Sequence, residues 1–156
     1  MKILITGGFG FIGSNLVAAL GKQHEIDILD GFTQDYVGHK YIHRGSKGLQ
    51  ETNDIEKKHR NLNLKYRLSL IKGCFNKIIN NHSFQSHIPL ENYDLIINCG
   101  ALSEAILSQH FPDFTHDSIV TGLSRIKQRF PHTPCLHISS SMVYGTWEEV
   151  IDEQYS

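Results

Sequence analysis

Residues 3–13 read ILITGGFGFIG, and this stretch decides the fold class. Three apolar residues lead into Thr6 and a glycine-rich turn, after which Ile12, Leu16 and Leu20 recur at helical spacing. The pattern predicts a strand, a tight turn and a helix in that order. The turn therefore joins the carboxyl end of the strand to the start of the helix.

A second apolar run, over residues 26–29, follows the helix and ends at Asp30 and Gly31. Strand, helix and strand together take about 30 residues, which is the length of a βαβ unit. Because the two strands of such a unit lie parallel, the sequence predicts a layered α/β fold.

The glycine spacing in this turn indicates a nucleotide site. Residues 8–13 satisfy the pattern GxGxxG, and residues 6–13 also satisfy TGxxGxxG. Glycines at a strand-to-helix turn let backbone N–H groups approach a pyrophosphate held at the helix N-terminus. The alternative is a tight structural turn with no ligand, but the context of strand and helix favours a bound dinucleotide.

Asp30 ends the second predicted strand, 17 residues beyond Gly13. A carboxylate at this place accepts hydrogen bonds from ribose hydroxyls and repels a 2′-phosphate. The sequence therefore favours NAD over NADP, although the nearby Lys40 and Arg44 keep NADP as an alternative. Without a ligand, Asp30 is simply a turn-forming residue before Gly31.

Three further strands are predicted from apolar runs, at residues 67–72, 94–99 and 135–138. The helix before the last strand carries an apolar stripe that we interpret as core packing rather than a cofactor site. The stripe consists of Ile119, Leu123, Ile126 and Phe130.

Residues 31–66 are predicted to form a surface insertion, with a polar helix near residues 51–61. Between residues 39 and 72 there are nine lysines and arginines and three acidic residues, a local excess of 9 − 3 = +6. This excess indicates either a solvated face or a surface that contacts an anion or a partner.

Composition excludes several classes of protein. The 156 residues are 40% apolar and carry 15 lysines and arginines against 16 acidic residues. We expect one domain over residues 1–156, with no nucleic-acid partner because the basic excess of such proteins is missing. Residues 3–21 carry no charge, but their glycines and polar residues make a poor membrane helix, so no membrane partner is expected.

The cysteines and histidines add two expectations. Cys74, Cys99 and Cys135 form no CxxC pair and are interpreted as reduced, mostly buried thiols of a cytoplasmic protein. The ten histidines form no HExxH motif, so no metal site is predicted.

Five segments together resemble the NAD-dependent epimerase/dehydratase family, the extended short-chain dehydrogenase/reductase group that includes UDP-galactose epimerase and sugar-nucleotide dehydratases. They are TGGFGFIGS (6–14), ILD (28–30), LIKGCFN (70–76), DLIINCGA (94–101) and HISSSMVYG (137–145). The resemblance implies a Rossmann-type doubly wound parallel sheet with strand order 3-2-1-4-5, ending before the C-terminal strands and substrate region of the family. It also implies the NAD-binding domain of a nucleotide-sugar epimerase or dehydratase, which acts by transient hydride transfer.

The resemblance implies roles for individual residues. Those implied to line the pyrophosphate are Gly7, Gly10, Phe11, Ile12 and Gly13. Asp30 would bind the ribose, and Gly100 and Ala101 would line the inner edge of the cofactor. Ser140 is implied to hydrogen-bond the substrate hydroxyl and the catalytic tyrosine, with Ser139 and Ser141 as alternatives. The alternative for Ser140 is a polar strand end with no catalytic role.

The chain departs from the family pattern in four respects. Cys74 stands where the third strand of the family has an aspartate, Asn98 where the fourth has a histidine, and Ile119 where the next helix has an asparagine. No YxxxK pair, in which the lysine lowers the pKa of the tyrosine, follows Ser140. We therefore expect these 156 residues to be inactive alone.

The fifth predicted strand would form an open sheet edge, which favours pairing with another chain. The expected partners are a dinucleotide, a nucleotide sugar in a complete version, and a second copy or a complementing chain at that edge. Two alternatives stay open: a non-catalytic NAD(P)-binding regulatory module, and an interaction protein that uses the basic segment.

Overall fold

The computed structural model describes residues 1–31, 41–43, 49–51, 53–81, 91–102 and 105–140. Its elements are, in chain order, β1 (Lys2–Thr6), α1 (Phe11–Leu20), β2 (Glu25–Asp30), β3 (Tyr41–His43), β4 (Leu49–Glu51), α3 (Asp54–Leu70), β5 (Lys77–Asn80), β6 (Leu95–Asn98), α4 (Ala105–His110), α5 (Pro112–His116), the π-helix η2 (Asp117–Thr121), α6 (Gly122–Arg129) and β7 (Cys135–His137).

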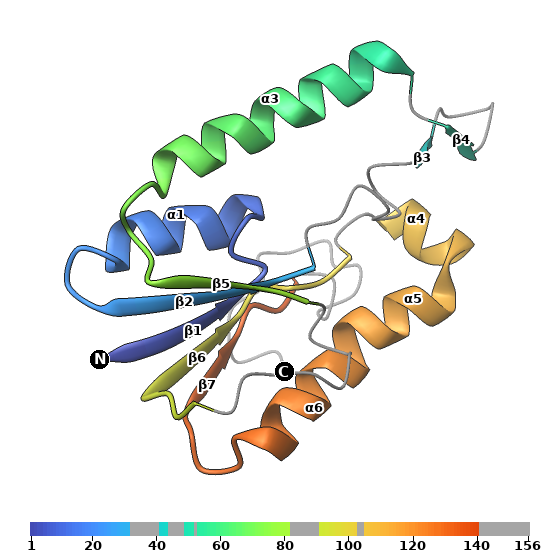
Figure 1. Cartoon of the computed structure of the whole chain (residues 1–156). Helices are drawn as coiled ribbons and strands as arrows, with labels where there is room; N and C mark the ends of the chain where they lie inside the picture. Colours follow the sequence, from blue (N-terminus) through green and yellow to red (C-terminus); the bar gives the residue numbers. More distant parts are fainter. Residues whose placement is uncertain (32–40, 44–48, 52, 82–90, 103–104, 141–156) are drawn as a thin grey trace, which may run out of the picture.

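Five parallel strands form the central sheet, in the order β5-β2-β1-β6-β7 (Figure 1). Counted along the chain among these five strands, the order is 3-2-1-4-5, so the predicted Rossmann-type sheet is confirmed. Ile5 of the central strand pairs with Ile28 of β2 on one side and with Ile97 of β6 on the other. Because all five strands run the same way, their carboxyl ends meet at one edge of the sheet.

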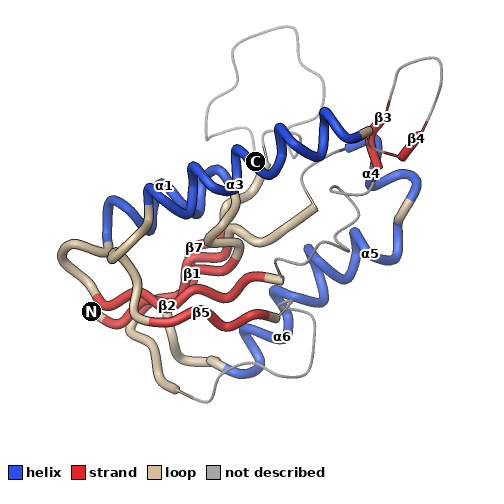
Figure 2. The backbone as a smooth tube through the Cα atoms, turned by 45° about the horizontal axis from the view of Figure 1, so that its top comes forward, coloured by secondary structure: helices blue, strands red, loops and turns tan. Residues whose placement is uncertain are grey.

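Helices cover both faces of the sheet (Figures 1 and 2). On one face, α1 and α3 pack over a core whose buried members are Ile3, Ile5, Phe9, Val17, Ile26, Ile28, Ile71 and Ile97. On the other face, Ile126 of α6 belongs to a second core whose other buried members are Leu4, Leu29, Tyr93, Ile96 and Phe130. Since burying one aliphatic side chain contributes about 1.5–3 kcal/mol, the continuous apolar run of β1 stabilises both layers.

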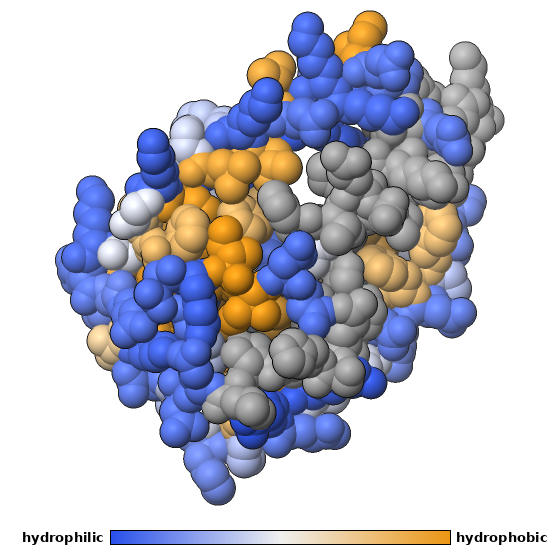
Figure 3. Space-filling view, in the orientation of Figure 1, coloured by the Kyte–Doolittle hydropathy of each residue, from blue (hydrophilic) through white to orange (hydrophobic). Residues whose placement is uncertain are grey.

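The outer surface of α3 is mostly hydrophilic, whereas apolar side chains gather beneath it, where the helix meets the sheet (Figure 3). Leu64 and Leu68 of its inner face pack against the core. Three apolar residues on its outer face, Ile55, Leu62 and Tyr66, are exposed. The basic residues of the predicted insertion therefore lie largely on a helix that belongs to the fold.

The predicted third strand was wrong. Residues 67–70 form the last turn of α3, and the third strand of the sheet is β5. A capping box starts this helix, because the Asn53 side chain accepts the Glu56 N–H while the Glu56 carboxylate accepts the Asn53 N–H. The helical spacing of Leu64, Leu68 and Ile71 then outweighs the short alternation over residues 67–72.

This correction also moves Cys74, which lies in the turn before β5 rather than on the third strand. Asn80, not Cys74, is the residue at the carboxyl end of that strand, where it pairs with Asp30. Of the predicted insertion at residues 31–66, Tyr41–His43 and Leu49–Glu51 form an antiparallel pair and residues 54–66 belong to α3. Lys40 and Arg44 lie outside the described residues.

The helix predicted before the last strand is interrupted by the π-turn η2. The wider turn changes which side chains face the core, so Ser118, Gly122 and Ile126 are buried, whereas Ile119 is only half-buried. Ile126 and Phe130 form part of the core as predicted.

The structure also describes the three cysteines and the lengths of the helices. Cys74, Cys99 and Cys135 are free thiols, but each is half-buried rather than fully buried. Within the described ranges, no helix has the length and apolar character needed to cross a membrane.

Candidate functional site

The turn after β1 requires glycine at its first position. Gly7 has a φ of 65°, and a Cβ added there would lie 2.8 Å from the Cα of Gly100. Its N–H also donates to the carbonyl of Leu29, at 2.8 Å. The bare backbone of Gly7 thus lies between the carboxyl ends of β2 and β6, in contact with Gly100.

The start of α1 presents backbone amides at this edge of the sheet. Gly10 is the N-cap, and no side chain caps the helix. Phe11, Ile12 and Gly13 are its first three residues, so their N–H groups have no carbonyl four residues earlier inside the helix. Phe11 and Ile12 are 73% and 48% exposed, whereas Gly13 is buried against the turn.

A small anion fits the donors and the shape of this turn. A Cβ on Gly13 would collide with the carbonyl oxygen of Gly7, so the backbone there is closer than other residues allow. The partial positive charge of a helix N-terminus adds to the aligned amides. The residues present therefore fit the pyrophosphate of a dinucleotide.

Asp30 lies beside the same turn. It ends β2, and its Oδ2 accepts the N–H of Phe9 at 2.9 Å. A carboxylate oxygen is also an acceptor for donors such as ribose hydroxyls. The structure thus joins Asp30 to the glycine turn, although 21 residues separate it from Phe9.

A row of polar residues continues along the carboxyl edge, and the sequence analysis did not predict it. Thr6, Asn98 and His137 are the last residues of β1, β6 and β7 and are paired in register. The Thr6 hydroxyl accepts the N–H of Gly100 at 3.0 Å and donates to Asn98 Oδ1 at 2.6 Å. Asn98 Nδ2 lies 3.0 Å from His137 Nδ1, which therefore accepts its hydrogen.

This row fixes the backbone of Gly100 against β1. Asn98 is 2% exposed, so its amide would be costly to bury without the two partners. The readable signal was polar residues at the ends of three apolar runs, since parallel strands bring such ends together. Asn98 thus has a structural role in this row.

Ala101 and Ser140 lie farther along the same edge. Ala101 follows Gly100 and is exposed, and Ser140 lies three residues beyond the end of β7 with an exposed side chain. Ser139 is exposed as well, and Ser141 lies outside the described residues.

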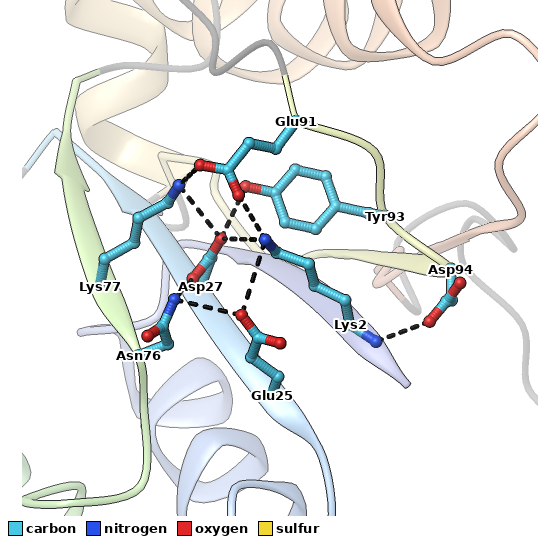
Figure 4. A network of polar contacts seen from close by, with 8 residues as sticks. All are labelled: Lys2, Glu25, Asp27, Asn76, Lys77, Glu91, Tyr93 and Asp94. Carbon is cyan, nitrogen blue, oxygen red and sulfur yellow. Dashed lines mark hydrogen bonds and ion pairs between the residues drawn. The ribbon is translucent and has the colours of Figure 1, made fainter.

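A second polar cluster lies at the opposite, amino-terminal edge of the sheet (Figure 4). At its centre the fully buried Asp27 accepts hydrogen bonds from the Tyr93 hydroxyl, at 2.9 Å, and from Asn76 Nδ2, at 3.1 Å. Lys77 Nζ lies 3.6 Å from Asp27 Oδ2, and both Lys2 and Lys77 contact the carboxylate of Glu91.

The electrostatics of this second cluster are those of a structural network. Hydrogen bonds from Lys2 and Lys77 lower the pKa of Glu91 to about 2. Burial, together with the hydrogen bond to Asp27, raises the pKa of Tyr93. Every buried oxygen of Asp27 has a donor, and among the described residues no group of three His, Cys, Asp or Glu could hold a metal ion.

Comparisons with known proteins agree with this fold. The model of the GDP-mannose 4,6 dehydratase family matches residues 4–155. No curated protein matches the chain.

Several solved structures have the same fold at low sequence identity. UDP-glucuronic acid 4-epimerase from Bacillus cereus, in complex with UDP-glucuronic acid and NAD, is 20% identical, with a TM-score of 0.71 over 99% of this chain and 45% of that chain. The UDP-Glc/GlcNAc 4-epimerase of Campylobacter jejuni is 22% identical, with a TM-score of 0.65 over 99% of this chain and 42% of that one.

A third structure is UDP-glucose 4-epimerase from Bifidobacterium longum, in complex with NAD+ and UDP. It is 17% identical, with a TM-score of 0.66 over 99% of this chain and 42% of that chain. The chain therefore spans less than half the length of each of these enzymes. At such identities the three structures establish the fold, whereas the family match extends over nearly all of the sequence. The chain thus belongs to the GDP-mannose 4,6 dehydratase family, within the NAD-dependent epimerase/dehydratase group that its motifs predicted.

Proposed function

We propose that the carboxyl edge of the sheet binds NAD, with the pyrophosphate on the amides of Phe11, Ile12 and Gly13. The observations that support this most are the start of α1, which no side chain caps, and the close approach of the Gly7 and Gly100 backbones beside it. Gly10 would line the same pyrophosphate, and Gly100 and Ala101 the inner edge of the cofactor. NAD-bound structures with the same fold support the choice of ligand.

Asp30 supports NAD rather than NADP. Its carboxylate would accept hydrogen bonds from the adenosine ribose, and its negative charge would repel a 2′-phosphate. The hydrogen bond from Phe9 holds this carboxylate beside the glycine turn. NADP is therefore expected to bind more weakly than NAD.

For the whole protein we propose a nucleotide-sugar epimerase or dehydratase. The bound nicotinamide would accept and return a hydride, and this chain would contribute Ser140 as a hydrogen-bonding partner of the reacting sugar hydroxyl. Family membership supports the reaction class, and the exposure of Ser140 at the carboxyl edge is compatible with the role. Because no YxxxK pair follows Ser140 in residues 141–156, we propose that these 156 residues bind without turnover.

A binding-only module is the second candidate, and Ile119 favours it. This residue is half-buried in η2, at the position where the family has a polar asparagine that could orient reacting groups. A regulatory NAD-binding protein would keep the glycine turn and Asp30 and would not need that side chain.

We also propose that a second polypeptide, either another copy or a complementing chain, pairs with β7. Among the described strands, β7 pairs only with β6 and forms one edge of the sheet. Leu136 and Ile138 at this edge are 57% and 39% exposed, an arrangement that favours strand addition. Replacing Leu136 with lysine should then shift the mass measured by light scattering toward the single chain. Equal masses for the two proteins would contradict the pairing.

Calorimetric titration of the 156-residue chain with NAD, NADH and NADPH tests the cofactor. We expect saturable binding of NAD and NADH and weaker binding of NADPH. Asp30→Asn keeps the shape of the side chain but loses its charge. In this variant the affinities for NADH and NADPH should differ less than in the wild type. If none of the three dinucleotides binds, the alternative of an interaction protein with this fold is favoured instead.

A further inference from the structure

The arginine in the last turn of α3 contacts the glycine turn across the fold. Arg67 Nη1 donates a hydrogen bond to the carbonyl oxygen of Phe9, at 3.1 Å, although the two residues are 58 positions apart in the sequence. The Arg67 side chain is half-buried. No motif indicated this contact, because it exists only once α3 lies over α1.

The contact falls on the peptide unit that leads into the N-cap of α1. The peptide between Phe9 and Gly10 has its carbonyl bonded to Arg67, and its N–H donates to the Gly7 carbonyl at 2.9 Å. The preceding peptide is fixed as well, since the Phe9 N–H donates to Asp30. Gly10, the N-cap, has extended backbone angles, and Phe11 begins the helix directly after it.

Arg67 is therefore a long-range restraint on the carbonyl side of this turn. Without it the Phe9 carbonyl would lose a charge-assisted hydrogen bond. Gly10, on the carboxyl side of this peptide, offers little resistance to rotation. The guanidinium also keeps a positive charge beside a turn that would carry a diphosphate, and its bond to Phe9 uses one of five N–H donors.

We propose that Arg67 is a positioning residue for the diphosphate of the bound dinucleotide, acting through the Phe9 carbonyl. This inference rests on the proposed NAD site and deepens it. Arg67 would influence the diphosphate, whereas Asp30 would influence the ribose. The Phe9 carbonyl would thus be bonded to the residue that influences the diphosphate, and the Phe9 N–H to the residue that influences the ribose.

Two variants and one control separate this role from general stability. Arg67→Met removes the donors and the charge, and Arg67→Lys keeps the charge but loses the planar fork. Lys65→Met is the control, since Lys65 is an exposed residue of the same helix and the variant loses the same charge. Binding of NAD, ADP-ribose and adenosine is measured for each protein, the last by NMR titration.

Arg67→Met should weaken the binding of NAD and of ADP-ribose by a similar factor, about tenfold, as expected for the loss of a hydrogen bond to a charged group. The affinity for adenosine, which has no diphosphate, should change by less than about twofold. Arg67→Lys should lie between the wild type and Arg67→Met, and Lys65→Met should bind NAD as the wild type does. In the absence of ligand, hydrogen exchange at the Gly10 amide should speed up in Arg67→Met only.

Equal weakening of NAD and adenosine would show a purely structural role and overturn the proposal, as would unchanged NAD binding in Arg67→Met. If Arg67→Met fails to fold, Arg67→Lys still decides: weaker binding of NAD and ADP-ribose with unchanged binding of adenosine supports the proposal, whereas equal weakening of all three ligands, or no change in any, overturns it. A wild-type chain that binds no NAD would instead overturn the proposed function, together with this inference.

Discussion

At the scale of single residues, the site depends on glycines that tolerate what other residues cannot. Gly7 combines a positive φ with backbone atoms of Cys99 and Gly100 within 2.9 Å of an added Cβ. Gly73 also has a positive φ, of 77°, but nothing lies within 4 Å of its added Cβ. Substitution of Gly73 therefore introduces backbone strain alone, whereas substitution of Gly7 introduces both backbone strain and a steric collision.

Gly73→Ala should lower the free energy of unfolding by about 1 kcal/mol, because only the left-handed backbone is penalised. Gly7→Ala should cost clearly more, about 3 kcal/mol or greater, because the sheet edge at Gly100 must also move. Urea unfolding of the two variants measures both values. Equal losses would mean that Gly7 and Gly100 do not meet as described.

Glu91 gives a prediction about pH. Its pKa is lowered from 4.5 to about 2 by hydrogen bonds from Lys2 and Lys77, so its contribution to stability is complete above pH 4.5. That contribution should be lost as the pH falls from about 4.5 toward about 2. Glu91→Gln should be less stable than the wild type at pH 7, and the difference should shrink in acid. A difference that stays constant down to pH 2 would contradict the network.

Cys99 gives a prediction about reactivity. Burial raises the pKa of its thiol to about 11, so little thiolate exists at neutral pH. We expect alkylation of Cys99 by iodoacetamide at pH 8 to be far slower than in urea-unfolded protein, as followed by peptide mass spectrometry. Alkylation at the same rate in both states would contradict the described burial.

At the scale of elements, α3 shows how a local motif can settle what a short pattern leaves ambiguous. Residues 67–72 alternate like a strand, but the Asn-x-x-Glu capping box at Asn53 and Glu56 marks a helix start 14 residues earlier. The four residues of β5 gave only a weak pattern, because an edge strand needs fewer apolar residues. The capping box therefore predicts α3 where the alternation alone predicts a strand.

The cap itself can be tested. Asn53→Ala should destabilise the protein by about 1 kcal/mol, since the Glu56 N–H loses its acceptor. Asn61→Ala, at an exposed position inside the same helix, should be neutral or slightly stabilising. Thermal unfolding of both variants compares the two effects, and an equally stable Asn53→Ala would contradict the cap.

At the scale of the whole molecule, the features that the sequence predicts are those that depend on short stretches of the chain. The glycine turn, Asp30 and the parallel sheet follow from runs and spacings within about 30 residues, and the structure places Gly7, Asp30 and Gly100 at one edge. The row of Thr6, Asn98 and His137, and the contact of Arg67 with Phe9, depend on strand register and helix packing. These contacts join residues 39 to 92 positions apart, so the spacing of residues within a short stretch of sequence does not specify the partners.

The central claim is that amides at the start of α1 bind a dinucleotide diphosphate, and an NMR titration of the ¹⁵N-labelled chain with NAD tests it directly. The amide signals of Phe11, Ile12, Gly13 and Gly100 should shift together and saturate at one NAD per chain. Signals near Lys2 and Glu91, at the opposite edge of the sheet, should stay in place. Absence of any shift in the glycine turn, or shifts confined to the Lys2 edge, would contradict the account.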